Sequence, residues 1–247
     1  MKGADLCTWK PLTEDGHVLW LKYSFGPGTA NSLAAKLADN TWLVISPPGE
    51  APAAVYDLLD QKGGVSALVA PNPYHHRGQA AWRERFPLSL SYAPSGALPR
   101  LSKKTPSIDY RSMDELAQKI RPVRQLLPNG MKAPDMLFQI PAKAGYVWWL
   151  GDQFSNSGRT DQIWLLRLLA RFAGSGLGYR VNSKPEFVYV RDRAAWLESI
   201  RAALKEMPPS VVLPAHGDPV TERVVERTRR AMDAIDTKKP RSAPERL

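Results

Sequence analysis

Short apolar runs that end in turn residues alternate with segments of helical periodicity, and this alternation limits the folds open to the chain. The runs at 18–25, 42–45 and 65–70 are each followed by Gly or Pro residues that break a strand. Strands dominate the beginning, and helices and strands alternate afterwards. This order predicts an α/β protein in which sheets pack together with helices on the outside.

The boundaries of the predicted elements follow from apolar periodicity and turn signals. We predict strands at 18–25, 31–37, 42–45, 65–70, 88–92, 136–140, 145–150, 187–190 and 211–213, and helices at 52–59, 79–86, 113–121, 160–173, 193–205 and 221–235. No repeat or clear linker divides the chain, so we expect a single domain over 1–237. The Pro-rich, basic segment 93–134 is expected to form a lid or an insertion, and 238–247 a flexible tail.

The composition indicates a globular core and excludes some site types. Apolar residues make up 43% of the 247 residues, and eight are Trp, which bury large areas. The single cysteine, Cys7, excludes an intrachain disulfide and a cysteine zinc cluster within one chain. The N-terminal region has no signal-peptide core, and no run of about 18 apolar residues occurs. We therefore expect a cytoplasmic protein with no membrane partner.

The chain carries a formal net charge of +10, and the basic residues are unevenly distributed. Eight Lys and Arg against three Asp and Glu occur in 99–132, and four Arg occur in 223–230. Two interpretations remain open: a solvated basic surface, or a surface for an anionic partner. A small anionic molecule suits this charge. Nucleic acid has weaker support, because no RGG repeat, zinc finger or RNP-type motif accompanies the charge.

Three of the four histidines and one aspartate follow predicted strands. His75 and His76 come after the strand at 65–70, Asp152 after the strand at 145–150, and His216 after the strand at 211–213. Taken singly, each has an ordinary surface or helix-capping role. Because strand ends in an α/β sheet can converge on one crevice, the four can also meet. Three imidazoles and a carboxylate suit Zn²⁺, and iron or manganese is also compatible.

The order and context of these segments resemble the metallo-β-lactamase fold superfamily, which carries the motif His-X-His-X-Asp-His-X-Gly after a strand. The corresponding stretch here reads Pro-Asn-Pro-Tyr-His-His-Arg-Gly. His76 falls on the last histidine of the motif, and Gly78 falls on its glycine. His75 falls on the motif aspartate. Pro71 and Pro73 fall on the first two histidines, and a proline side chain cannot coordinate a metal.

Later segments extend this resemblance to nearly the whole chain. The Trp-Leu-Gly-Asp at 149–152 resembles the strand that delivers the family's metal-bridging aspartate. The stretch 211–220 resembles its late His-Gly motif and is the most specific match. The segments 31–33 and 42–45 are similar to its first hairpin. The resemblance implies an αββα four-layer sandwich of metallo-β-lactamase type.

The departures from the family pattern all affect one of its two metal positions. Besides the two proline replacements, no histidine occurs between His76 and His216, so the family's middle histidine has no counterpart. The resemblance implies that His75, His76, Asp152 and His216 could still hold one Zn or Fe ion. The other interpretation is a vestigial pocket with no metal and no other cofactor. Four protein ligands would fill a tetrahedral site, so catalysis would require a fifth position.

Two hypotheses of function follow from the resemblance. The first is a mono-metal hydrolase of an ester, thioester or phosphoester. The second is a non-catalytic family member, with a degenerate active site, that binds an anionic ligand, a protein or nucleic acid. Tyr74, Arg77 and Asn156, which neighbour the site in sequence, are the candidates to contact the substrate or ligand. The alternatives are core packing for Tyr74, a surface position for Arg77 and a loop role for Asn156. The sequence specifies neither the catalytic residues nor the substrate nor the oligomeric state.

Overall fold

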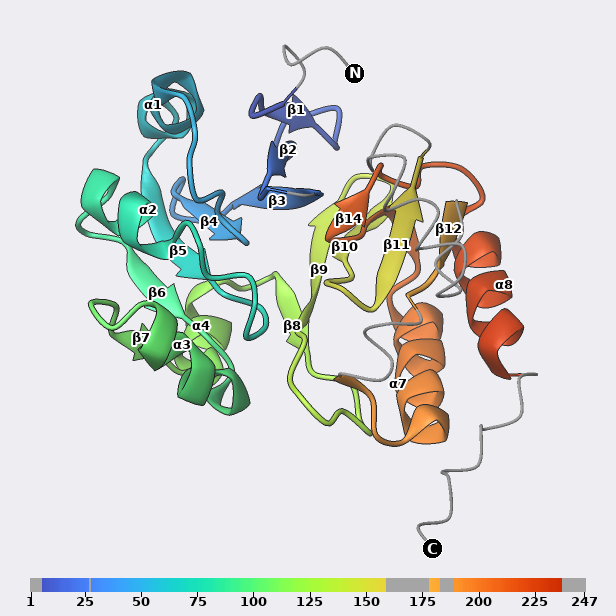
Figure 1. Ribbon diagram of the computed structural model, residues 1–247. Helices are drawn as coiled ribbons and strands as arrows, with labels where there is room; N and C mark the ends of the chain where they lie inside the picture. The colour runs from blue at the N-terminus through green and yellow to red at the C-terminus, as the bar shows by residue number, and fades with distance from the viewer. Residues whose placement is uncertain (1–5, 27, 159–177, 183–188, 237–247) are drawn as a thin grey trace, which may run out of the picture.

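The computed structural model describes residues 6–26, 28–158, 178–182 and 189–236 and shows a four-layer arrangement (Figure 1). Two layers of β-sheet face one another in the middle. Helices α1 (Ala53–Gln61) and α2 (Gln79–Arg85) lie outside the first layer, and α7 (Arg193–Glu206) and α8 (Val224–Asp236) lie outside the second. The αββα sandwich predicted from the sequence is confirmed.

The first layer is a seven-stranded sheet in the order β1 to β7. Its antiparallel part, β1 to β4, begins the chain, and the neighbours from β4 to β7 pair in parallel. Parallel neighbours require crossover connections, which α1, α2 and α3 (Leu98–Lys104) help to provide. The strands are β1 (Lys10–Pro11), β2 (Val18–Ser24), β3 (Thr29–Lys36), β4 (Trp42–Ile45), β5 (Val65–Val69), β6 (Leu90–Tyr92) and β7 (Tyr110–Arg111).

The second layer contains a four-stranded sheet in the order β13-β10-β9-β8 and a three-stranded sheet in the order β12-β11-β14. The short strand β14 pairs in parallel with β11, and this pairing sets Ser155 opposite His216. The strands are β8 (Arg124–Leu126), β9 (Leu137–Ala142), β10 (Gly145–Trp149), β11 (Phe154–Ser157), β12 (Gly178–Val181), β13 (Pro209–Leu213) and β14 (His216–Gly217).

Apolar clusters fill the spaces between the layers. Successive side chains of a strand point to opposite faces of the sheet, so neighbouring residues belong to different clusters. On β4, Val44 packs with the cluster under α1 and α2, whereas its neighbour Ile45 faces the second sheet. On β10, Trp149 enters the space between the sheets, and Trp148 packs against α7 and α8. Both indole rings are fully buried, because helices or a sheet cover each face of this strand.

The segment 93–134, for which a lid or an insertion is predicted, is built into the sandwich. Its strand β7 extends the edge of the first sheet, and β8 begins the second. From α4 (Met113–Lys119), Leu116 joins Ile120 in the cluster between the sheets. The helix α3 and the short strands β1, β7, β8, β11, β12 and β14 are absent from the sequence prediction. The predicted helix 160–173, the first half of the strand 187–190 and the tail 238–247 lie outside the described residues.

None of the helices in the described part of the chain combines the length and the apolar content that crossing a bilayer requires.

Gly217 provides a test of the pairing that holds β14 against β11. Its φ of +94° is left-handed, and an added Cβ would lie 2.0 Å from the carbonyl oxygen of Asn156. We expect Gly217→Ala to lower the free energy of unfolding by about 3 kcal/mol or more, since backbone strain and overpacking add. The control Gly16→Ala has a φ of +67° but open space around its Cβ, so about 1 kcal/mol is expected. Urea titration measures both, and equal losses would contradict the steric argument.

Candidate metal centre

His216 is held in place by contacts from the first sheet. The fully buried Asn31 on β3 donates from its Nδ2 to the carbonyl oxygens of Pro214 (2.8 Å) and Gly217 (2.7 Å), which flank the histidine. The Nδ1 of His216 lies 2.8 Å from the carbonyl oxygen of Thr29. Because a carbonyl can only accept, Nδ1 carries a proton, and Nε2 is the nitrogen available to a ligand.

Asp152 follows β10 through Gly151, whose φ of +56° turns the chain at the end of the strand. The backbone N–H of Asp152 donates to the Oδ2 of the buried Asp135 at 2.9 Å. One side-chain oxygen, Oδ2, accepts from the Tyr189 hydroxyl (3.0 Å) and from the Nδ2 of Asn72 (3.1 Å). These contacts fix the carboxylate so that its Oδ1 faces the two histidines.

His75 lies in the loop after β5, where Asn72 shapes the backbone. The Oδ1 of Asn72 accepts from the backbone N–H groups of Tyr74 (2.8 Å) and His75 (3.2 Å), a turn typical of asparagine. The Nδ1 of His75 lies 2.6 Å from the Oγ of Ser46, which also contacts the buried Tyr23 hydroxyl at 3.0 Å. Ser46 has a left-handed φ of +56° and is fully buried, so its hydroxyl is tightly placed.

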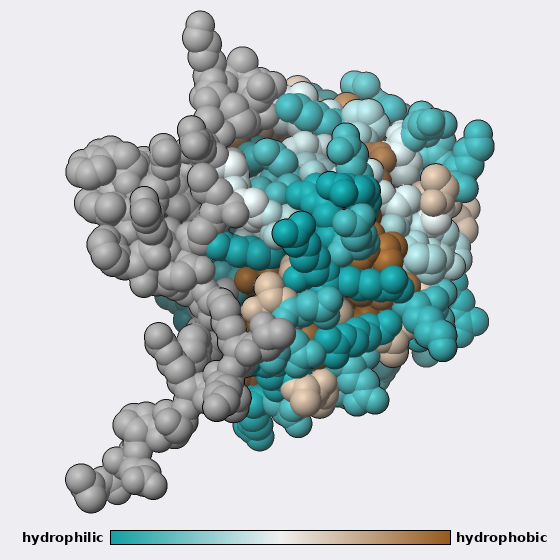
Figure 2. Space-filling view, turned by 90° about the vertical axis from the view of Figure 1, so that its right-hand side faces the viewer, coloured by the Kyte–Doolittle hydropathy of each residue, from teal (hydrophilic) through white to brown (hydrophobic). Residues whose placement is uncertain are grey.

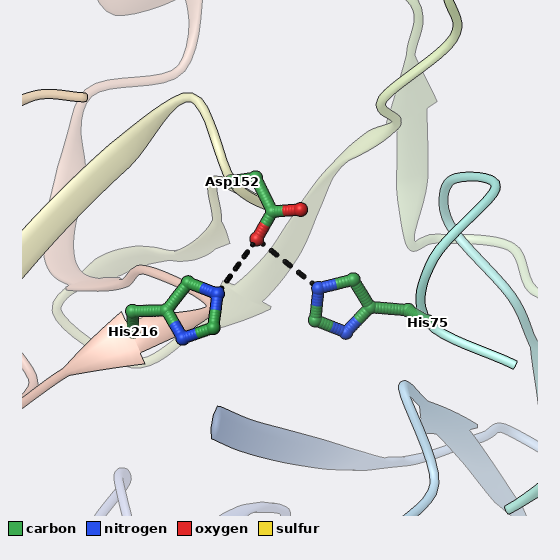
Figure 3. Close-up of side chains that lie close together, drawn as sticks. All are labelled: His75, Asp152 and His216. Carbon is green, nitrogen blue, oxygen red and sulfur yellow. Dashed lines mark hydrogen bonds and ion pairs between the residues drawn. The ribbon is translucent and has the colours of Figure 1, made fainter. Parts of the chain in front are cut away.

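These three residues converge on one point. The Nε2 atoms of His75 and His216 each lie 3.1 Å from the Oδ1 of Asp152 (Figure 3). One ligand atom from each residue lies within 4.8 Å of the other two. Two imidazole nitrogens and a carboxylate oxygen are donors that Zn²⁺ and Fe²⁺ accept. Oxygen partners engage both Nδ1 atoms, as is usual for metal-binding histidines, so the donor set fits a metal ion.

The electrostatics of the cluster place negative charge on Asp152. Burial alone would raise the pKa of Asp152, but the neighbouring His75 and His216 outweigh it and hold this pKa well below its usual value. Burial lowers the pKa of His216, but its contacts with Asp152 and the Thr29 carbonyl outweigh burial, so the pKa is raised. Burial and the charge of Asp152 raise the pKa of Asp135 well above its usual value. The site therefore favours a cation beside Asp152.

The structure brings together three of the four predicted metal ligands, and His76 is not among them. His76 begins the turn into α2, where its carbonyl accepts from the Gln79 N–H at 3.1 Å. Its Nδ1 is buried without a hydrogen-bond partner among the described residues, and burial lowers its pKa. The cluster therefore contains three of the four expected ligands, His75, Asp152 and His216.

A cavity of about 330 Å³ opens beside the cluster. All three cluster residues and His76 line it, together with Tyr74 and the basic side chains of Arg77, Arg100 and Lys104. The guanidinium carbon of Arg100 lies 4.5 Å from the centre of the Tyr74 ring, a cation–π contact. Arg100 and Lys104 belong to α3, so the basic segment 93–134 borders the site.

Two of the three residues predicted to contact the substrate line the cavity, and the third lies elsewhere. Tyr74 and Arg77 line the cavity as expected. Asn156 does not, because β11 directs it elsewhere and its Nδ2 donates to the Asp218 carbonyl at 2.9 Å. The sequence prediction missed Ser46, Asn72, Asp135 and Tyr189. A local signal existed for Asn72, which lies between two prolines at the end of a predicted strand.

Comparison with known proteins supports the fold but not a closer relationship. No family model matches the sequence, and no curated protein matches it. Solved structures do match over nearly their whole length. A metallo-β-lactamase from Erythrobacter litoralis, with β-mercaptoethanol in its active site, has a TM-score of 0.64 at 14% identity, covering 95% of this chain and 99% of that one.

Two further structures give the same result. The metallo-β-lactamase FIM-1 from Pseudomonas aeruginosa, in its mono-zinc form, has a TM-score of 0.61 at 13% identity, covering 94% of this chain and 97% of that one. A metallo-β-lactamase from Hirschia baltica has a TM-score of 0.58 at 11% identity, covering 92% and 98%. The chain has the metallo-β-lactamase fold, as the sequence resemblance implies.

Ser46 provides a test of the support for His75. We expect Ser46→Ala to weaken Zn²⁺ binding by about 10- to 100-fold, because the Nδ1 of His75 loses the partner that fixes the ring. Ser91→Ala is a matched control, since Ser91 is also a buried serine but its Oγ has no partner among the described residues. Competition with a chromophoric chelator measures both dissociation constants. Equal affinities in the two variants would contradict the assigned role of Ser46.

Proposed function

From the metallo-β-lactamase fold and the geometry of the cluster, we propose that this protein is a mono-metal hydrolase of an anionic ester, thioester or phosphoester. One observation carries the proposal: the ligand atoms of His75, Asp152 and His216 lie within 4.8 Å of one another and line a basic cavity. Three protein ligands leave a coordination position open, which is typical of catalytic zinc sites, whereas structural sites have four.

The sequence supports one metal rather than two. Pro71 and Pro73 occupy the positions at which the family pattern has its first two histidines, and the whole chain has only four histidines. The ligands of the second metal therefore have no replacement at those positions. The structurally similar FIM-1 is described in a mono-zinc form, which supports a single ion in this fold.

The described residues can hold and orient a metal in a defined way. The Nε2 atoms of His75 and His216 and the Oδ1 of Asp152 would bind Zn²⁺ or Fe²⁺, and Tyr189 and Asn72 prevent the carboxylate from rotating through their contacts with its Oδ2. The bound ion would supply Lewis acidity, polarising a carbonyl or phosphoryl oxygen and activating water.

The substrate class follows from the charge of the cavity wall. Arg77, Arg100 and Lys104 line it, and Asp152 is the acidic residue among the described residues that do so. Guanidinium groups bind carboxylate and phosphate through paired hydrogen bonds. The Nη1 of Arg77 donates to the Phe25 carbonyl at 2.9 Å, and Arg100 packs on Tyr74, so both side chains have preferred positions before a substrate arrives.

A second candidate function is anion binding without catalysis. Both Nε2 atoms lie at hydrogen-bond distance from the same Asp152 oxygen, so the cluster can also form a closed network of hydrogen bonds. The basic cavity would then remain as the functional feature. Metal analysis distinguishes the two candidates.

Metal content of the purified protein tests the ligand set. By inductively coupled plasma mass spectrometry, we expect about one Zn or Fe per wild-type chain, and almost none in His216→Ala and Asp152→Asn, because a two-ligand site binds weakly. His76→Ala should retain the metal. His17→Ala is a control, since 63% of that side chain is exposed and it pairs with Asp15 away from the cavity. A metal-free wild type of full stability would overturn the hydrolase in favour of anion binding.

Arg100 tests the substrate class of the metal-loaded protein. We expect Arg100→Gln to raise KM for an ester with a terminal carboxylate by about tenfold, with kcat nearly unchanged, because it removes a charged hydrogen bond formed in both ground and transition states. Hydrolysis of the matched neutral ester should be unaffected. Arg85→Gln is the control, since Arg85 pairs with Asp57 and Asp60 away from the cavity. Equal losses with both esters would contradict an anionic substrate.

A further inference from the structure

A second basic cavity lies between α8 and β12, apart from the candidate metal centre. Its volume is about 310 Å³, and it shares none of its described lining residues with the first cavity. Four of the residues that line it are arginines, and the described residues contribute a single carboxylate, Glu226. The four are Arg180, Arg223, Arg227 and Arg230, which we call the arginine pocket.

Two of these arginines, Arg227 and Arg230, belong to α8, and Arg223 lies immediately before it. Arg223 directly precedes the helix, and its carbonyl accepts from the Arg227 N–H at 2.8 Å, so the spacing to Arg227 is one helical turn. Arg230 follows after nearly another turn. At 1.5 Å per residue, the three span about 10 Å along the helix. The buried face of α8 contains Val224, Thr228 and Met232 instead.

Two of the three acidic residues of α8 are directed to a different neighbour. Asp233 and Asp236 both pair with Arg201 of α7, at 3.2 and 2.8 Å. Glu226 is 3.6 Å from the Nη1 of Arg223, and both side chains are more than 60% exposed, so this pair contributes little. Among the described residues, the lining of the arginine pocket therefore carries an excess of positive charge. Figure 2, which views the side of the molecule where α8 lies, shows strongly hydrophilic side chains gathered there.

The walls of the pocket indicate what it can recognise. The Tyr179 ring stacks with Phe154 at a centroid distance of 5.7 Å, and the Arg227 guanidinium carbon lies 5.7 Å from its centre. The Tyr179 hydroxyl lies 3.1 Å from the Oγ1 of Thr228. The other uncharged lining residues are Ala231 and Ala234. An aromatic ring that is already engaged provides no platform on which a base could stack, so the pocket suits charge rather than an aromatic ligand.

We propose that the arginine pocket binds a compact polyphosphate chain, of the kind carried by nucleoside di- and triphosphates. Guanidinium groups match phosphate oxygens in paired hydrogen bonds, and their spread along α8 suits more than one phosphate group. A bound polyanion would also relieve the mutual repulsion of the clustered arginines. The concave shape favours a small ligand over the extended track that a nucleic acid strand requires.

Calorimetric titration of the purified protein with inorganic tripolyphosphate at low salt tests this proposal. We expect binding to the wild type and a loss of affinity of about tenfold or more in the double variant Arg227→Gln/Arg230→Gln, because two charged hydrogen-bonding groups are removed. Arg229→Gln is the matched control, since Arg229 is an exposed arginine of the same helix that does not line the pocket. Arg100→Gln should also retain binding, which separates this pocket from the metal-centre cavity.

Three outcomes would overturn the proposal: no binding to the wild type, equal binding by the double variant, or an equal loss in Arg229→Gln. Two further probes resolve the ligand class. ATP should bind no more tightly than tripolyphosphate, because no base platform is free. Binding of a single-stranded oligonucleotide that the double variant loses, without binding of tripolyphosphate, would show a nucleic-acid surface instead. Unchanged thermal unfolding midpoints verify that the variants are folded.

Discussion

The carboxylate of Asp152 joins side chains from distant parts of the chain in one buried hydrogen-bond network. Its Oδ2 accepts from Tyr189 and Asn72, and its Oδ1 faces His75 from the loop after β5 and His216 from β14, which lie far apart in the sequence. Because Oδ2 is restrained, Oδ1 has a fixed position. The two imidazole rings are restrained in turn by Ser46 and the Thr29 carbonyl, so the geometry of the cluster is set by the fold.

Because the Asp152 carboxylate is buried, the groups around it determine whether it can stay ionised. An ionised carboxylate away from water is stable only beside a positive charge or several hydrogen-bond donors. Asp135 lies next to it, and the two carboxyl groups respond oppositely: burial and Asp152 raise the pKa of Asp135, while the histidines outweigh burial and lower the pKa of Asp152. The negative charge is therefore concentrated where His75 and His216 converge. A metal ion or an imidazolium would balance this charge.

The sequence predicted where the site would form but not its details. His75, Asp152 and His216 follow β5, β10 and β13, and strand ends converge in a sandwich of this kind. His76 lies outside the group of three ligands, and the periodicity of the sequence does not distinguish it from His75. Ser46 and Tyr189 reach the site across sequence separations of 29 and 37 residues, where no local pattern operates. Likewise β11, with the sequence FSNS, lacks an alternating apolar pattern. It is a strand because its backbone pairs with β12 and β14.

That three and not four of the expected ligands come together bears on the proposed function. Four protein ligands would fill a tetrahedral site, as in a structural metal site, whereas three would leave a position open on a bound ion. The same reasoning applies to the positive charge of the chain, for which a solvated surface and an anion-binding surface were both open. Exposed Arg111 and Arg201 pair with carboxylates, as a solvated surface would. Arg100 and Lys104 line one cavity and the arginines beside α8 line another, so part of the charge is concentrated in concave sites that suit anions.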